Sequence, residues 1–123
     1  MWCALGKARV TLSEKRRKFA VLFRHLLQFI EDRGYECEIE EVKRTQAQAT
    51  ANAASGAGIA NSLHLLGLAV DLSLFIHDDF TSALEDYRPL GEFWKSLDPL
   101  CCWGGDFSKP DADHFSLSHN GIK

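Results

Sequence analysis

The segment "SLHLLGLAVDLSLF", at residues 62–75, places the strongest constraint on the fold of this chain. Most of its side chains are Leu, Ala, Val and Phe, which predicts a buried segment. His64 and Asp71 interrupt this apolar run. A carboxylate in a protein interior is costly unless another group compensates its charge. Any fold of this chain must therefore bring a compensating partner to Asp71.

Residues 68–76, "LAVDLSLFI", alternate as a strand does, because successive side chains of a strand point to opposite faces. One predicted face carries Ala69, Asp71, Ser73 and Phe75, and the other carries Val70, Leu72, Leu74 and Ile76. Gly67 disfavours a continuous helix from His64 to Asp71. We therefore expect His64 to precede the strand and Asp71 to lie within it, so that both side chains approach one point.

The remaining pattern predicts helices and short strands that do not alternate regularly. Residues 11–34 form an amphipathic helix with a capping box at Thr11 and Glu14. Residues 36–44 begin as a strand, and residues 81–97 are helical with a break or restart at Pro89. Residues 101–118 give a loop, an Asp-rich turn and a last strand beginning near His114. This order predicts an α+β fold, a small antiparallel sheet with helices packed on one side.

Residues 45–61 are rich in Ala, Gly, Asn and Ser, and they predict a short helix or a partly ordered loop. Small side chains over such a length suit a surface against which another molecule lies. A plain connecting loop explains the composition equally well.

Composition narrows the class of protein. The chain has 123 residues, which we interpret as one domain with no separate second domain. Its net charge of −3 argues against a general nucleic-acid binder, and "KRRK" at 15–18 is interpreted as a solvated helix face. No apolar run or secretory signal predicts membrane insertion or export, so we expect the chain to be made in the cytoplasm. We also expect it to be a monomer.

Four cysteines, at positions 3, 37, 101 and 102, contain no Cys-x-x-Cys pair. Without a secretory signal, disulfides are not favoured. Adjacent cysteines at 101 and 102 do not easily present both sulfurs to one metal ion. Structural or free thiols are therefore expected at all four positions.

A metal ion would let the carboxylate of Asp71 lie in an apolar strand. Hydrolytic zinc sites usually have three protein ligands drawn from His, Asp and Glu. His64 and Asp71 are candidates for two of them, and His114 in "DADHF" is a candidate for the third. Asp111, three residues earlier, is then placed to act as a general base on water. Without a metal, His64 would cap or hydrogen-bond, Asp71 would pair with an arginine such as Arg44, and His114 would be a packed strand residue.

Three motifs in order resemble one enzyme family. "SLHLLGLAVDL" matches the SxHxxGxAxD signature of the zinc D-Ala-D-Ala-type peptidases, which share a metal-site fold with the Hedgehog signalling domain. "DADH" is similar to their second motif, and "WGGDF" at 103–107 is typical of the segment just before it. Over most of its length the chain resembles the small phage endolysins that act as L-alanyl-D-glutamate peptidases.

The resemblance implies a role for individual residues. His64, Asp71 and His114 are implied to bind Zn²⁺, with Asp111 as catalytic base. Arg44 is implied to stabilise the oxyanion that develops at the scissile carbonyl, which agrees with the electrostatics of acyl transfer. Ser62 and Trp103 are implied to contact the substrate. Ser62 could instead orient His64 or cap a turn. Trp103 could instead belong to the core.

Asp113 departs from the resemblance, because related sequences often have Pro or Asn before the last ligand. It is a competitor of Asp111 for the role of base, or a negative charge that raises the pKa of a neighbour. We expect Asp111 to be the base.

The activity implied is hydrolysis of the L-Ala–D-Glu bond in peptidoglycan stem peptides by an endolysin that lyses the host cell wall. The enzyme would reach the wall in the periplasm after another protein opens the membrane. Two alternatives remain: a D-Ala-D-Ala carboxypeptidase or dipeptidase, and a non-enzymatic binding module that zinc stabilises. A degenerate module would be expected to lack Asp111 or Arg44, and both are present.

Overall fold

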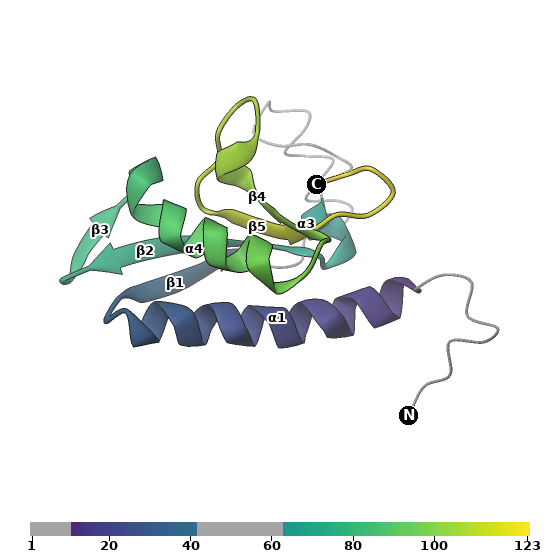
Figure 1. Ribbon diagram of the computed structural model, residues 1–123, viewed down its shortest axis with the longest axis horizontal. Helices are drawn as coiled ribbons and strands as arrows, with labels where there is room; N and C mark the ends of the chain where they lie inside the picture. Colours follow the sequence, from purple (N-terminus) through teal and green to yellow (C-terminus); the bar gives the residue numbers. More distant parts are fainter. Residues whose placement is uncertain (1–10, 42–62) are drawn as a thin grey trace.

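The computed structural model describes residues 11–41 and 63–123 of the chain. Within them, helices lie against a small sheet (Figure 1), which confirms the predicted α+β class. The elements, in chain order, are α1 (Leu12–Asp32), β1 (Glu36–Glu41), α3 (Leu63–Leu66), β2 (Ala69–Ile76), β3 (Asp79–Thr81), α4 (Leu84–Leu97), β4 (Cys101–Trp103), the 3₁₀ turn η1 (Gly104–Asp106) and β5 (His114–Leu117).

The sheet is antiparallel in all its pairings, with the order β1-β2-β5-β4 and with β3 paired to β2. β2 is the central strand, and β1 lies along one of its edges. Its other edge is shared, because β5 pairs with Ala69–Asp71 and β3 pairs with Leu74–Ile76. Asp71 is thus opposite His114 in the last residue pair that joins β2 to β5, before β2 goes on to pair with β3.

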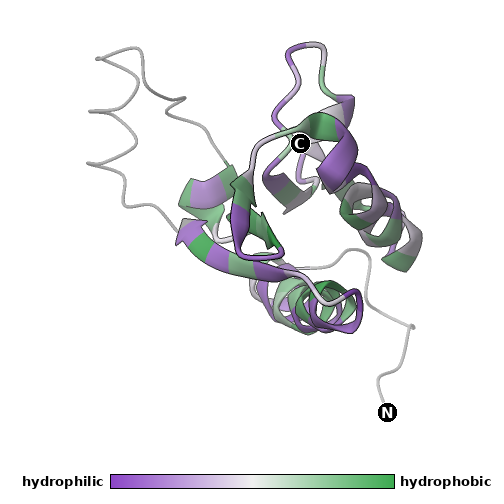
Figure 2. Cartoon of the chain, turned by 90° about the vertical axis from the view of Figure 1, so that its left-hand side faces the viewer, coloured by the Kyte–Doolittle hydropathy of each residue, from purple (hydrophilic) through white to green (hydrophobic). Residues whose placement is uncertain are grey.

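The core lies between the sheet and the helices α1 and α4. Val70 of β2 is opposite Phe115 of β5, and Phe115 contacts Trp94 of α4 edge-on at 6.2 Å between ring centroids. Phe19 of α1 contacts the same indole at 5.8 Å. Hydrophilic and hydrophobic residues alternate around α1 and α4 (Figure 2), so each helix gives its apolar stripe to this core. Asp71 and His114 belong to the opposite face of the sheet.

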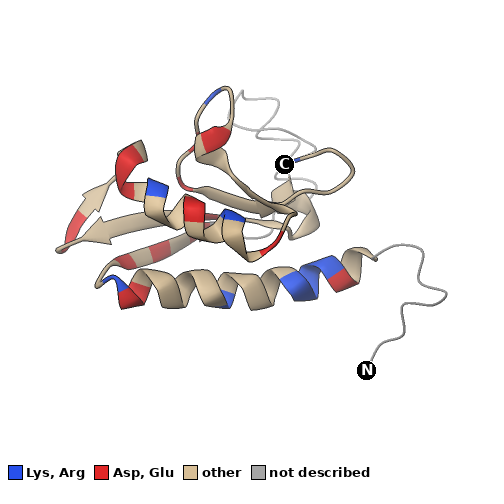
Figure 3. Ribbon diagram, in the orientation of Figure 1, with Lys and Arg blue, Asp and Glu red and all other residues tan. Residues whose placement is uncertain are grey.

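Helix α1 begins as the sequence predicts. Thr11 accepts a hydrogen bond from the Glu14 amide at 3.1 Å, and the Glu14 carboxylate accepts one from the Thr11 amide at 3.1 Å. Lys and Arg gather in the N-terminal half of this helix (Figure 3). Two of these cations also join the helix to other elements, since Lys18 pairs with Asp98 at 2.8 Å and Arg16 donates to the Leu66 carbonyl at 2.7 Å.

Three details of the predicted secondary structure were wrong. The sequence predicts a helix from residue 81, but Asp79–Thr81 forms the strand β3 and the helix begins at Leu84. Helix α4 runs through Pro89 without a break. A proline removes only one backbone hydrogen bond there, and the buried face of Tyr87, Leu90, Gly91 and Trp94 outweighs that loss. Residues Cys101–Trp103 form a strand rather than a loop, because they pair with residues 115–117 of β5. The prediction for residues 45–61 lies outside the described residues.

Cys37, Cys101 and Cys102 are free thiols. In the described part of the chain, no helix has the length and apolar character that a membrane span needs.

Tyr87 closes the gap where β2 leaves β5 and joins β3. Its hydroxyl donates to the Leu72 carbonyl at 2.8 Å and accepts from the Leu74 amide at 3.0 Å. The Leu72 amide donates to the Asp113 carbonyl at 3.0 Å. One side chain therefore satisfies two buried backbone groups of the central strand at the point where strand pairing stops.

Replacing Tyr87 by Phe is expected to lower the free energy of unfolding by about 1–3 kcal/mol, because two buried backbone groups lose their partner. Urea denaturation measures the change. The matched control is Tyr35→Phe, since among the described residues the Tyr35 hydroxyl accepts a hydrogen bond only from the exposed Arg33, at 3.3 Å. That variant should change the free energy by no more than about 0.5 kcal/mol. Equal effects of the two substitutions would contradict this role of Tyr87.

Candidate functional site

His64 is fixed by a one-turn helix that ends immediately before the central strand. In α3 and the turn that follows, the Gly67 amide donates to the His64 carbonyl at 3.2 Å and the Leu68 amide donates to the Leu63 carbonyl at 2.9 Å. Gly67 has a φ of 74°, a conformation that favours glycine. This turn reverses the chain, so that His64 lies over the strand residue Asp71, as the sequence predicts.

His64, Asp71 and His114 converge on one point of the sheet face. The Nε2 atom of His64 lies 3.2 Å from Oδ1 of Asp71, and Nδ1 of His114 lies 3.5 Å from the same oxygen. The two imidazole rings are 5.5 Å apart at 76°. Both histidines are buried, with 3% and 7% of their surface exposed, while Asp71 is half-buried. One potential ligand atom from each residue lies within 4.8 Å of the others.

The electrostatics of Asp71 follow from its two histidine neighbours. Burial by itself would raise the pKa of this carboxyl group, but its contacts with His114 and His64 outweigh burial and lower the pKa to about 2. The Oδ1 atom is buried and has no well-aligned hydrogen bond among the described residues. A carboxylate that remains charged in this position, beside two imidazole nitrogens, is a donor set that suits Zn²⁺. The residues present therefore fit the metal.

Asp111 and Asp113 lie next to these three residues. Ligand atoms of Asp71, Asp111 and Asp113 are within 4.8 Å of one another. Asp111 is exposed, whereas Asp113 is half-buried. Burial, a hydrogen bond with Asp111 and the charge of Asp71 raise the pKa of Asp113 well above its ordinary value. The structure thus brings the predicted base to the candidate metal centre, and it brings its predicted competitor there as well.

A cavity of about 200 Å³ opens beside these two carboxylates. Its walls include Ser73, two residues after Asp71 on the same face of β2, and Phe80 of β3. Tyr87 closes another wall of the cavity. Ser73 and Phe80 are residues that the sequence analysis did not select, and no motif marked them. Their contribution depends on the separation of β3 from β5, which the sequence pattern does not predict.

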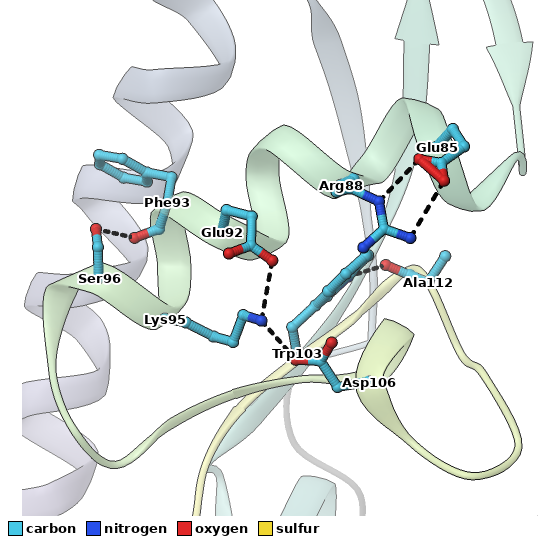
Figure 4. Close-up of polar contacts among 9 residues, drawn as sticks. All are labelled: Glu85, Arg88, Glu92, Phe93, Lys95, Ser96, Trp103, Asp106 and Ala112. Carbon is cyan, nitrogen blue, oxygen red and sulfur yellow. Dashed lines mark hydrogen bonds and ion pairs between the residues drawn. The ribbon is translucent and has the colours of Figure 1, made fainter.

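The other predicted site residues divide into two groups. Arg44 and Ser62 lie outside the described residues. Trp103 is 1% exposed, which places it in the core, one of the two roles that the sequence left open. Its indole N–H donates to the Ala112 carbonyl at 2.7 Å (Figure 4). Trp103 therefore contacts the turn that carries Asp111, and its ring offers almost no surface to a substrate.

Comparison with known proteins gives the family. A family model described as D-alanyl-D-alanine carboxypeptidase matches residues 55–117, which include all three candidate metal ligands and Asp111. The chain belongs to this peptidase family. No curated protein matches the sequence.

Among solved structures, the chain is similar to the crystal structure of Serratia marcescens L-Ala D-Glu endopeptidase ChiX. The TM-score is 0.69 at 20% sequence identity, over 94% of this chain and 93% of the other. At this identity the likeness establishes the fold. It agrees with the α+β architecture described above.

The low pKa of Asp71 predicts how the metal-free protein responds to acid. The folded carboxyl titrates near 2 and the unfolded one near its ordinary value of 3.8. Its stabilisation is therefore present above about pH 4 and is lost as the pH falls toward 2. Asp71→Asn should remove this part of the acid sensitivity. Unfolding free energies of both proteins at several pH values between 2 and 5, with a chelator present, measure it. Parallel curves for the two proteins would show that Asp71 is not held in its charged form.

Proposed function

We propose that this protein is a zinc-dependent peptidase that hydrolyses the L-Ala–D-Glu bond of peptidoglycan stem peptides. The observation that carries the proposal is the convergence of His64, Asp71 and His114 around a buried carboxylate oxygen, with Asp111 next to it. The family match supports peptidase chemistry. The printed title of the similar structure, an L-Ala D-Glu endopeptidase, supports this choice of bond.

His64, Asp71 and His114 would hold the metal through two imidazole nitrogens and one carboxylate oxygen. When bound, Zn²⁺ supplies a Lewis acid for the scissile carbonyl and lowers the pKa of a water molecule toward neutrality. The protein contributes rigidity to this site, because each ligand comes from a different, hydrogen-bonded element of the fold. His64 belongs to α3, Asp71 to β2 and His114 to β5.

Asp111 would act as the general base and acid. Its carboxylate is exposed and close to Asp71, so it can accept a proton from the attacking water and return it to the leaving amine. The cavity beside Asp111 would receive the part of the peptide that carries the leaving amine. Arg44 is proposed to stabilise the oxyanion and Ser62 to contact the substrate, on the basis of the sequence resemblance.

The biological role proposed is that of an endolysin. The resemblance to small phage endolysins supports it, and this role places the substrate in the periplasm, reached after another protein has opened the membrane. A carboxypeptidase or dipeptidase acting on D-Ala-D-Ala remains the competing activity, because the family model carries that description.

Digestion of purified sacculi tests the activity and the bond together. The zinc-loaded protein should release peptide fragments, and a chelator should abolish the release. Mass spectrometry should find new N-terminal D-Glu on the fragments and L-Ala left on the glycan strands. Loss of terminal D-Ala alone would support the carboxypeptidase. An absence of any release by protein that contains zinc would overturn the enzymatic function and favour a binding module.

Two substitutions separate the base from the ligands. Asp111→Ala should lower turnover by at least about 100-fold, the typical scale of general base catalysis, and should leave about one zinc ion per chain. Asp71→Ala should instead lose zinc, because it removes a ligand. Zinc content by atomic absorption and sacculus turnover are measured on the same samples. Glu31→Ala, at an exposed acid near the end of α1, is the control and should change neither. Loss of zinc from Asp111→Ala would mean that the two roles are assigned wrongly.

A further inference from the structure

The turn 111–113 is the part of the fold that carries the proposed base, and each of its carbonyl groups is held by a different donor. The Asp111 carbonyl accepts from the His114 amide at 3.2 Å, and the Asp113 carbonyl accepts from the Leu72 amide at 3.0 Å. The Ala112 carbonyl, between them, accepts from the indole Nε1 of Trp103 at 2.7 Å. Among these three hydrogen bonds, only the one from Trp103 uses a side chain. The Asp111 amide in addition donates to the Gly104 carbonyl at 2.9 Å. The turn is therefore held by backbone hydrogen bonds and, among the described residues, by the side chain of Trp103.

The indole ring has almost no room to move. A Cβ atom added to Gly91 of α4 or to Gly105 of η1 would overlap ring atoms of Trp103. Both glycines therefore permit a contact of the backbone with the ring that any other residue would block. With 1% of its surface exposed, the ring is enclosed by α4 and by the segment that follows β4. The position of the Nε1–H group is fixed by this packing rather than by the turn that it contacts.

Charged side chains of α4 complete the enclosure (Figure 4). The guanidinium of Arg88 and the ammonium of Lys95 lie 5.7 and 5.8 Å from the ring centroid, within the range of cation–π attraction. Arg88 is held by Glu85 at 2.8 Å. Lys95 is held by Asp106 of η1 at 2.7 Å, which also joins α4 to the segment next to the turn.

We propose that Trp103 is a positioning residue for Asp111: its packed indole holds the Ala112 carbonyl and thereby places the carboxylate of Asp111 at the His64, Asp71 and His114 centre. The inference rests on the proposed function, in which Asp111 is the base. On this inference Trp103 is a core residue that affects the reaction only through the position of Asp111, without contact with the substrate. The "WGG" segment is then part of the support for the catalytic turn.

The matched pair of variants is Trp103→Phe and Trp94→Phe. Trp94 is also fully buried, and its indole donates to a backbone carbonyl, that of Ser116, at 3.1 Å. Both substitutions remove a buried indole donor, so both should lower thermal stability. Only Trp103→Phe should lower kcat on a soluble stem-peptide substrate, by about 10- to 100-fold, because a small displacement of a catalytic group has effects of this size. KM and zinc content should stay within about twofold of wild type.

Trp103→β-(3-benzothienyl)alanine is the second variant, since it keeps the shape of the ring and lacks the N–H group. It should reproduce the fall in kcat even if Trp103→Phe fails to fold. The same replacement at Trp94 is its control. Equal kcat values for the 103 and 94 variants, or a change confined to KM, would overturn the positioning role.

Amide hydrogen exchange tests the inference without any activity. In the Trp103 variants the amides of Asp111 and His114, which belong to the hydrogen bonds of the turn, should exchange at least about tenfold faster relative to the core. The Trp94 variants should leave this ratio unchanged. Unaltered exchange in the Trp103 variants would refute the inference. If wild-type protein cleaves no peptide but the turn loosens as expected, the proposed function fails and the structural part of the inference stands.

Discussion

The structure depends on one pairing, that of Asp71 with His114 across two adjacent strands. It brings a carboxylate and an imidazole to the same sheet face with Nδ1 and Oδ1 3.5 Å apart, and the short helix α3 adds His64 at 3.2 Å from the same oxygen. A carboxylate with such neighbours remains charged although burial disfavours its charge. The apolar residues on either side of Asp71 pack into the core and keep this strand in register. The same strand therefore supplies both the stability of the fold and the proposed metal ligand.

The sheet separates these two tasks by face. Side chains that point toward α1 and α4, such as Val70 and Phe115, form the core, and those that point away, such as Asp71 and His114, form the candidate centre. The central strand changes partner just after Asp71, and that change creates the space beside Asp111 and Asp113. Tyr87 and Trp103 hold the two sides of this opening through hydrogen bonds to backbone groups. Packing on one face is thus coupled to the geometry of the groups on the other.

Much of this arrangement could be predicted from the sequence, because it depends on local patterns. The alternation of side chains predicted the two faces of the strand that contains Asp71, and a capping box predicted the start of α1. The motifs indicated His64, Asp71, His114 and Asp111 as site residues. Other features depend on contacts between distant residues. The continuity of α4 through Pro89 and the pairing of Cys101–Trp103 with β5 are decided by packing, which overrides local preference. The hydrogen bond from the Trp103 indole to the Ala112 carbonyl involves a backbone acceptor, which a pattern of side chains does not predict.

X-ray absorption at the zinc edge tests the proposed metal centre most directly. Protein loaded with one equivalent of zinc should show only nitrogen and oxygen ligands at about 2.0–2.2 Å, with the multiple scattering of two imidazole rings. Asp71→Ala should weaken or remove this signal, because the carboxylate at the centre is lost. A sulfur shell at about 2.3 Å, or scattering from fewer than two imidazoles, would contradict a centre made by His64, Asp71 and His114.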